Sequence, residues 1–110
     1  MTEMMTAVVQ TEGRPAEQIS SDIPPTVLII GKKRARDYIA PALFRIGSFS
    51  RVDIKAKGTL SISTAVDVAE LVKRDIENAK VESISVGTDQ VDAGGIPRRV
   101  SFIEIAITRQ

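Results

Sequence analysis

A short unbroken apolar run, Val27–Ile30, is followed at once by a concentration of positive charge. The run is bounded by Pro24-Pro25 and Gly31, which is typical of a buried strand. Four cations then occur within five residues: Lys32, Lys33, Arg34 and Arg36. They precede a segment with helical periodicity, where cations oppose the helix macrodipole. The cluster therefore indicates an anionic partner, the alternative being a solvated run of charge.

Apolar positions recur at helical spacing over residues 35–46, and the predicted helix stops at Gly47-Ser48. Its apolar face is expected to hold Tyr38, Ile39, Ala42, Leu43 and Ile46. Pro41 lies inside this segment and lacks the amide that would bond to Asp37, which costs roughly 3 kcal/mol in a helix interior. We therefore expect either a kink or a shorter hydrogen-bonded part.

Strict alternation predicts a second strand over Arg51–Lys57. Its inward side chains are Val52, Ile54 and Ala56, and its outward ones are Asp53, Lys55 and Lys57. A second helix follows Gly58, with Ser61, Ser63 and Thr64 as candidate N-caps, and ends near Asn78. Its expected buried stripe is Ile62, Val66, Ala69, Val72 and Ile76. Val68 and Leu71 widen the apolar arc enough to meet a second subunit.

Two long strands are predicted over residues 81–92 and 98–109, joined by a glycine-containing turn at 93–97. Near the turn the residues become polar and include Arg98 and Arg99, so this hairpin is expected to project from the body. Further along, Ile103, Ile105 and Ile107 share one face, while Phe102 and Ala106 share the other with Glu104 between them. Apolar residues on both faces suggest a partner surface.

The predicted order is βαβαββ, which gives a two-layer α/β (α+β) sandwich of a four-stranded mixed sheet and two helices. Residues 26–110 would form this domain, and residues 1–25 a disordered acidic tail. The tail has one arginine against four carboxylates, so it carries a net charge of −3 and leaves +4 on the remainder. Eight of the fourteen cations of residues 26–110 lie in three places, which is typical of a binding face. These are Lys32, Lys33, Arg34 and Arg36; Lys55 and Lys57; and Arg98 and Arg99.

The composition limits the possible chemistry. The 110 residues include no cysteine and no histidine, which removes thiolate metal sites and the commonest general base. Asp53-Ile54-Lys55 with Asp37 resembles the acidic-x-lysine element of metal-dependent nucleases, but outward-facing residues on an amphipathic strand explain it better. We expect no enzyme, metal or cofactor. No apolar stretch approaches a membrane span, so a soluble cytoplasmic protein is expected.

These elements together resemble the Alba family of archaeal chromatin proteins. The stretches that carry the resemblance are Ile29-Ile30-Gly31-Lys32-Lys33, Asp37-Tyr38-Ile39, Val52-Asp53-Ile54-Lys55-Ala56-Lys57-Gly58, Ile62-Ser63-Thr64-Ala65-Val66-Asp67, Ser85-Val86-Gly87, Arg99-Val100-Ser101 and Ile103-Glu104-Ile105-Ala106-Ile107. The resemblance implies a fold like the C-terminal domain of translation initiation factor three. It also implies a nucleoid-associated homodimer that binds double-stranded DNA without sequence preference, with dimer-dimer assembly on the DNA.

The resemblance also implies roles for individual residues. Lys32 and Lys33 match a lysine pair on the DNA-facing surface, a region that is acetylated in several relatives. Lys57 matches a basic position at the end of the second strand. Arg98 and Arg99 match the basic part of a hairpin arm that reaches along the minor groove.

This chain departs from the family pattern at several positions. Thr59-Leu60-Ser61 is one residue longer than usual and lacks the arginine often found after the glycine. Thr64 stands where a lysine is common, and Arg34 replaces a frequent proline. Ile76 stands where some members carry a phenylalanine used between neighbouring dimers.

Two other functions fit the same residues. The first is binding of structured RNA, alone or in a ribonuclease P-like complex. The aromatics Tyr38, Phe44, Phe49 and Phe102 are expected mostly on core faces, which argues against single-strand stacking. A scaffold that binds no nucleic acid is the second, and it would leave the basic clusters unused.

Overall fold

The computed structural model describes residues 23–110, and it has the predicted element order. In chain order the elements are β1 (Val27–Ile30), the 3₁₀ helix η2 (Ala35–Tyr38), α2 (Ile39–Phe49), β2 (Arg51–Lys57), α3 (Thr59–Asp75), β3 (Ala79–Ala93) and β4 (Ile96–Arg109). The predicted tail lies largely outside the described residues. Across the described chain no helix is long and apolar enough to cross a bilayer.

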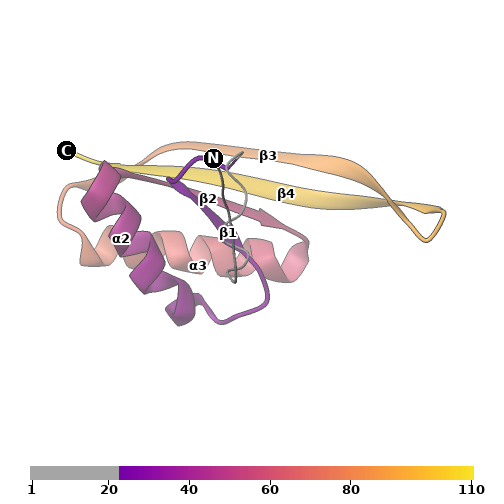
Figure 1. Ribbon diagram of the computed structural model, residues 1–110, viewed down its shortest axis with the longest axis horizontal. Coiled ribbons are helices and arrows are strands. Elements are labelled where there is room, and N and C mark those ends of the chain that lie inside the picture. Colours follow the sequence, from indigo (N-terminus) through magenta and orange to yellow (C-terminus); the bar gives the residue numbers. More distant parts are fainter. Residues whose placement is uncertain (1–22) are drawn as a thin grey trace, which may run out of the picture.

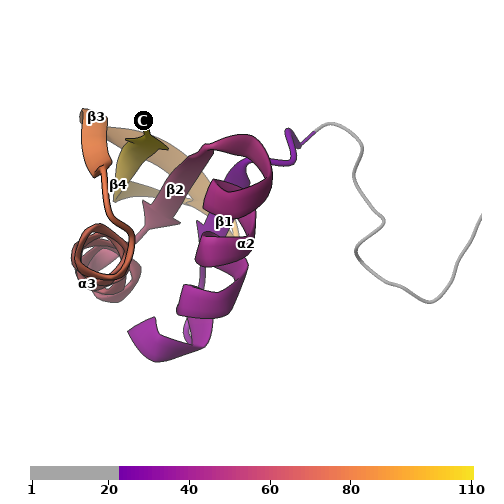
Figure 2. The same ribbon diagram turned by 90° about the vertical axis from the view of Figure 1, so that its left-hand side faces the viewer.

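The four strands form one mixed sheet in the order β1-β2-β4-β3. β1 runs parallel to β2, and the other two pairs are antiparallel. Both helices pack on one face of this sheet, α2 toward β1 and α3 toward β4 (Figure 2). The predicted two-layer sandwich is therefore confirmed. The opposite side of the sheet, here called the open face, is not covered by any helix of residues 23–110.

The core lies between the helices and the two central strands. Val52 and Ile54 on β2 stand opposite Ile107 and Ile105 on β4, and all four side chains are buried. Alternate residues of a strand point to opposite faces, so the charged residues of β2 must lie on the open face. Burial of such aliphatic side chains contributes about 1.5 to 3 kcal/mol each, which fixes the register of the central pair.

The first helical segment differs from its prediction at both ends. Residues 35–38 form a 3₁₀ helix, and the α-helix begins only at Ile39. Pro41 is thus in the first turn of α2, where an amide has no partner within the helix, and the expected shortening of the hydrogen-bonded part is found. The predicted stop at Gly47-Ser48 is wrong, because α2 continues to Phe49 and ends where Ser50 adopts a left-handed φ of 58°.

Arg45 anchors α2 to the edge of the sheet. Its Nε donates to the carbonyl of Val27 at 3.1 Å and its Nη1 to the carbonyl of Pro41 at 2.9 Å. Burial lowers the pKa of Arg45. The contact satisfies a carbonyl of edge strand β1, which would otherwise be free to pair with another chain.

The second helix begins earlier and is rotated relative to its prediction. It starts at Thr59 after Gly58, so the proposed N-caps Ser61, Ser63 and Thr64 are wrong. Its C-terminus also comes earlier, at Asp75. Val68 is fully buried whereas Val66 is 43% exposed, which reverses the roles assigned to them. The buried residues of α3 are Ala65, Val68, Ala69 and Val72.

The hairpin turn is tighter than predicted. It consists of Gly94 and Gly95, whose φ values of 64° and 82° suit glycine, and Ile96 already belongs to β4. β2 pairs with β4 only up to Phe102, and from Ser101 to the turn β4 pairs with β3 alone. This two-stranded ribbon extends well past the helices (Figure 1).

Candidate nucleic-acid interface

Residues 31–36, here called the basic turn, present four exposed cations. Lys32, Lys33 and Arg34 follow β1, and Arg36 lies in η2. Within residues 23–110 none of the four forms an ion pair. Their charge is therefore available to an external anion.

Tyr38 holds the backbone of the basic turn in place. Its buried phenol oxygen accepts the amide of Gly31 at 2.7 Å and the amide of Lys33 at 3.3 Å. Asp37 accepts the amide of Arg34 at 3.3 Å. The turn thus has a fixed path, although its cationic side chains point into solvent.

The N-terminus of α3 lies next to the basic turn. Because β1 and β2 are parallel, Gly31 and Gly58 leave the sheet at the same end. Ser61 spans the gap, since its Oγ donates to the carbonyl of Gly31 at 3.0 Å. The first turn of α3 has no side-chain cap and no acidic residue, so positive charge from the turn and the helix end meets here.

Lys55 and Lys57 do not join this cluster as free cations. Both lie on β2 toward the open face, where the nearest oxygen of Glu104 is 3.8 Å from the Lys55 ammonium, and Lys57 lies 3.0 Å from Asp89. The Lys57 side chain is still 62% exposed. Exposed ion pairs contribute about 0 to 1 kcal/mol, so an external phosphate can compete for either lysine.

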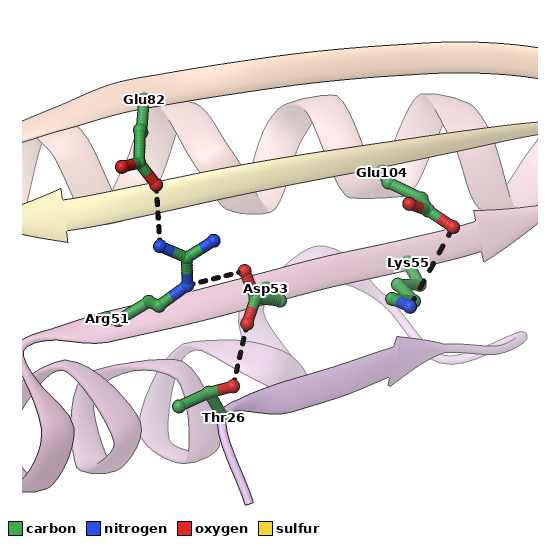
Figure 3. A network of polar contacts seen from close by, with 6 residues as sticks. All are labelled: Thr26, Arg51, Asp53, Lys55, Glu82 and Glu104. Atoms are coloured by element: carbon green, nitrogen blue, oxygen red, sulfur yellow. Dashed lines mark hydrogen bonds and ion pairs between the residues drawn. The ribbon is translucent and has the colours of Figure 1, made fainter. Parts of the chain in front are cut away.

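A second polar network covers the open face near the start of β2 (Figure 3). Arg51 contacts Asp53 at 2.9 Å and Glu82 at 2.6 Å, and Thr26 donates to Asp53 at 2.7 Å. Glu82 occupies a register shift between Val81 and Ser83 on β3. Burial lowers the pKa of Arg51, but hydrogen bonds and charge attraction to Glu82 and Asp53 together raise it by more. The network sets one cation against two carboxylates, so this part of the open face presents no free cation to a polyanion.

Arg98 and Arg99 lie on the extended ribbon, and both are exposed. They stand opposite Val91 and Gln90 of β3, beyond the last pair between β2 and β4. Successive residues of a strand point to opposite faces, so the two guanidinium groups leave opposite faces of the ribbon. A ligand lying on one face meets one arginine, whereas a groove that encloses the ribbon meets both.

The residues of the nuclease hypothesis have other partners. Asp53 contacts Thr26 and Arg51, Lys55 faces Glu104, and Asp37 caps η2. Among the residues that the structure describes, no group of three or more carboxylates is placed to hold a metal ion.

The expectation that the aromatics lie mostly in the core is wrong. Tyr38 alone is buried, while Phe44 is 65% and Phe49 44% exposed. Phe102 is half-buried and lies on the open face, since the buried Ile103 and Ile105 face the helices. Because side chains alternate along β4, the sequence already indicated that Phe102 faces away from the isoleucines. Its apolar side chain nevertheless favoured the prediction of a core position.

Comparison with known proteins gives one consistent result. The family model named Alba matches residues 26–88. The DNA/RNA-binding protein Alba of Nitrosopumilus maritimus is 39% identical over 85 residues, covering 74% of this chain and 88% of that protein. The protein of the same name from Picrophilus torridus is 37% identical over 86 residues, covering 76% and 94%.

Solved structures of similar proteins also match this chain. Alba from Thermoplasma volcanium superposes with a TM-score of 0.68 at 33% identity, covering 76% of this chain and 99% of that one. ALBA1 from Trypanosoma brucei has a TM-score of 0.63 at 21% identity, covering 80% and 72%, and shares the fold.

Proposed function

The chain belongs to the Alba family, and we propose that it binds double-stranded DNA without sequence preference, as a homodimer that coats or compacts the chromosome. The relatives' name, DNA/RNA-binding protein, supports a nucleic acid as the ligand. The observation that carries the proposal is the basic turn, with four exposed cations on a backbone fixed by Tyr38 and Ser61.

Phosphate contact is the mode of binding that these residues support. Lys32, Lys33, Arg34 and Arg36 are long, exposed cations on a turn. Within residues 23–110 no helix carries a row of Asn, Gln or Arg side chains that could read base edges. Each contact with a phosphate releases condensed counterions, which supplies affinity independent of sequence. Acetylation of Lys32 or Lys33 would remove one such contact.

The two-stranded ribbon is the second part of the protein that would contact DNA. In a twofold dimer each protomer contributes a basic turn and a ribbon, so one duplex could lie across the body between two arms. Arg98 and Arg99, on opposite faces of the ribbon, suit insertion into the narrow minor groove, whose two walls carry phosphate.

Exposed apolar residues on β3 support the homodimer. Ile84 and Val86 are 60% and 71% exposed, and they stand opposite Ile105 and Ile103 on the helix side of the sheet. The helices leave this part of edge strand β3 uncovered. Val66, 43% exposed on α3, adds to the apolar surface available to a second copy.

Structured RNA is the second candidate ligand. Phosphate contacts serve either polymer, and the relatives are named for both DNA and RNA. A duplex RNA of the same length belongs in every binding assay beside the DNA.

The test is the binding of unrelated 30-base-pair duplexes by fluorescence anisotropy. The variant Lys32→Ala/Lys33→Ala should bind all of them more weakly, and by the same factor, because phosphates carry no sequence information. The control Lys73→Ala/Lys80→Ala removes the same charge from exposed positions in the last turn of α3 and early in β3. An equal loss in both variants would refute the assignment of the basic turn, and a loss confined to one duplex would refute the contact mode.

A further inference from the structure

Phe102 lies on the open face of the sheet and is half-buried. On either side it stands opposite Lys57 of β2 and Gly87 of β3. A Cβ added to Gly87 would stand 2.6 Å from Cζ and 2.8 Å from Cε2 of the phenyl ring. The ring therefore rests on the backbone of Gly87, in the space that a side chain would fill. The tip of the ring packs on β3, and the half-buried side chain leaves part of the ring exposed.

A depression of about 520 Å³ lies on this part of the open face. Ile29, which is 57% exposed, and Phe102 supply apolar surface, and Lys55, Lys57, Asp89 and Glu104 add charged groups. Sites for small organic ligands have volumes of about 300 to 1,000 Å³ and combine apolar surface with a few polar groups. The depression is thus large enough for a base and part of its sugar.

The depression leads directly to the basic turn. Its lining includes Ile30, the residue before Gly31, and Lys57, the residue before Gly58. Both strands end here, at the edge where the exposed cations begin. A polymer with a base in the depression therefore has a continuous path past Lys57 to Lys32 and Lys33.

We propose that this depression is a second site, which binds single-stranded nucleic acid by stacking one base on Phe102. The inference rests on the proposed function, since it assumes that the basic turn binds phosphates. An aromatic ring on a central strand of a sheet is how several RNA-binding modules hold splayed bases, and stacking tolerates any base.

The charged groups of the depression fit this ligand. Lys57 is 62% exposed and its pair with Asp89 is a surface pair, so its ammonium can turn to a phosphate at little cost. The carboxylates of Asp89 and Glu104 can accept hydrogen bonds from the amino groups of bases. Two cations and two carboxylates balance one another, so a rigid polyanionic duplex gains little here, whereas a strand that contributes a base gains the stacking.

The experiment compares a 12-nucleotide adenine RNA, a DNA strand of the same sequence and a 30-base-pair duplex DNA. The test variant is Phe102→Leu, which keeps apolar cover over Gly87 but lacks an aromatic ring. It should bind both single strands at least fivefold more weakly and to a similar degree, because stacking requires no 2′-hydroxyl. Its affinity for the duplex should be that of the wild type. The matched control, Phe44→Leu, changes an exposed phenylalanine on α2 and should leave all three affinities unchanged.

The outcomes separate this site from the basic turn. An unchanged single-strand affinity in Phe102→Leu, with normal duplex binding, would overturn the site and leave the proposed function intact. Failure of the wild type to bind any of the three would refute the proposed function itself. A direct check uses the wild type alone. Stacking should shift the ring proton resonances of Phe102 upfield when the RNA is added, and unchanged chemical shifts would overturn the site.

Discussion

The phenol oxygen of Tyr38 lies 2.7 Å from the amide nitrogen of Gly31, and this hydrogen bond ties η2 back to the end of β1. The same oxygen lies 3.3 Å from the amide nitrogen of Lys33, so one buried side chain holds two amides in the first half of the basic turn. A turn already fixed loses less conformational entropy when it binds. Tyr38 therefore links the core to the candidate interface.

The variant Tyr38→Phe should lower the free energy of unfolding by about 1 kcal/mol, because two amides lose an acceptor while the ring still fills the core. Urea unfolding measures the change. Ser63→Ala removes a hydroxyl from an exposed position on α3 and is the matched control, with no loss expected. Equal stability of Tyr38→Phe and the wild type would show that water replaces the phenol oxygen without cost.

A second prediction concerns the contact between Gly87 and Phe102. Gly87→Ala should destabilise the protein by about 1 kcal/mol, because the ring must move away from the new methyl group. In the Phe102→Leu background the same change should cost less or even stabilise, since alanine suits a strand better than glycine. A double-mutant cycle by thermal unfolding gives the coupling. Additive effects would mean that the ring does not rest on Gly87.

The sequence predicted the order of elements and the residues that share a face of β2 and of β4, because both strands alternate cleanly. The prediction failed where contacts between distant parts of the chain determine the start and the orientation of a helix. Ser61 has the side chain of an N-cap, yet its hydroxyl reaches Gly31 across the fold and α3 starts after Gly58 instead. Val66 and Val68 exchanged roles because the pattern admits two orientations of the helix, and packing against the sheet selects one.

In the candidate site, too, local features could be predicted from the sequence and contacts between distant strands could not. The cations of the basic turn follow from their position between a strand and a helix. The ion pairs of Lys55 and Lys57 depend on Glu104 and Asp89, which come from strands more than thirty residues away in the sequence. The place of Phe102 over Gly87 likewise requires the pairing of β3 with β4.

A third prediction tests the homodimer. Light scattering at micromolar concentration should give twice the mass of the chain for the wild type. Ile84→Asp/Val86→Asp should give the mass of one chain, because it places charges on the exposed apolar part of β3. Phe44→Asp makes the same kind of change on α2 and should remain dimeric. A wild-type monomer across this range would contradict the proposed dimer, and a dimeric β3 variant would contradict its proposed interface.

The contribution of the ribbon can be measured through Arg98→Glu/Arg99→Glu. This variant should flatten the salt dependence of duplex binding, because fewer phosphates are neutralised. Thermal stability should stay close to that of the wild type, since both side chains are exposed and lie beyond the part of β4 that pairs with β2. An unchanged slope would restrict the interface to the body of the protein.

The most direct test of electrostatic, sequence-independent binding is the affinity of the wild type for duplex DNA as a function of salt. Two basic turns and two ribbons would engage on the order of 6 to 10 phosphates, so the affinity should fall roughly 10³- to 10⁵-fold between about 50 and 200 mM salt. The fall should be the same for duplexes of unrelated sequence. A fall of less than about tenfold over this range would contradict phosphate contact as the source of affinity.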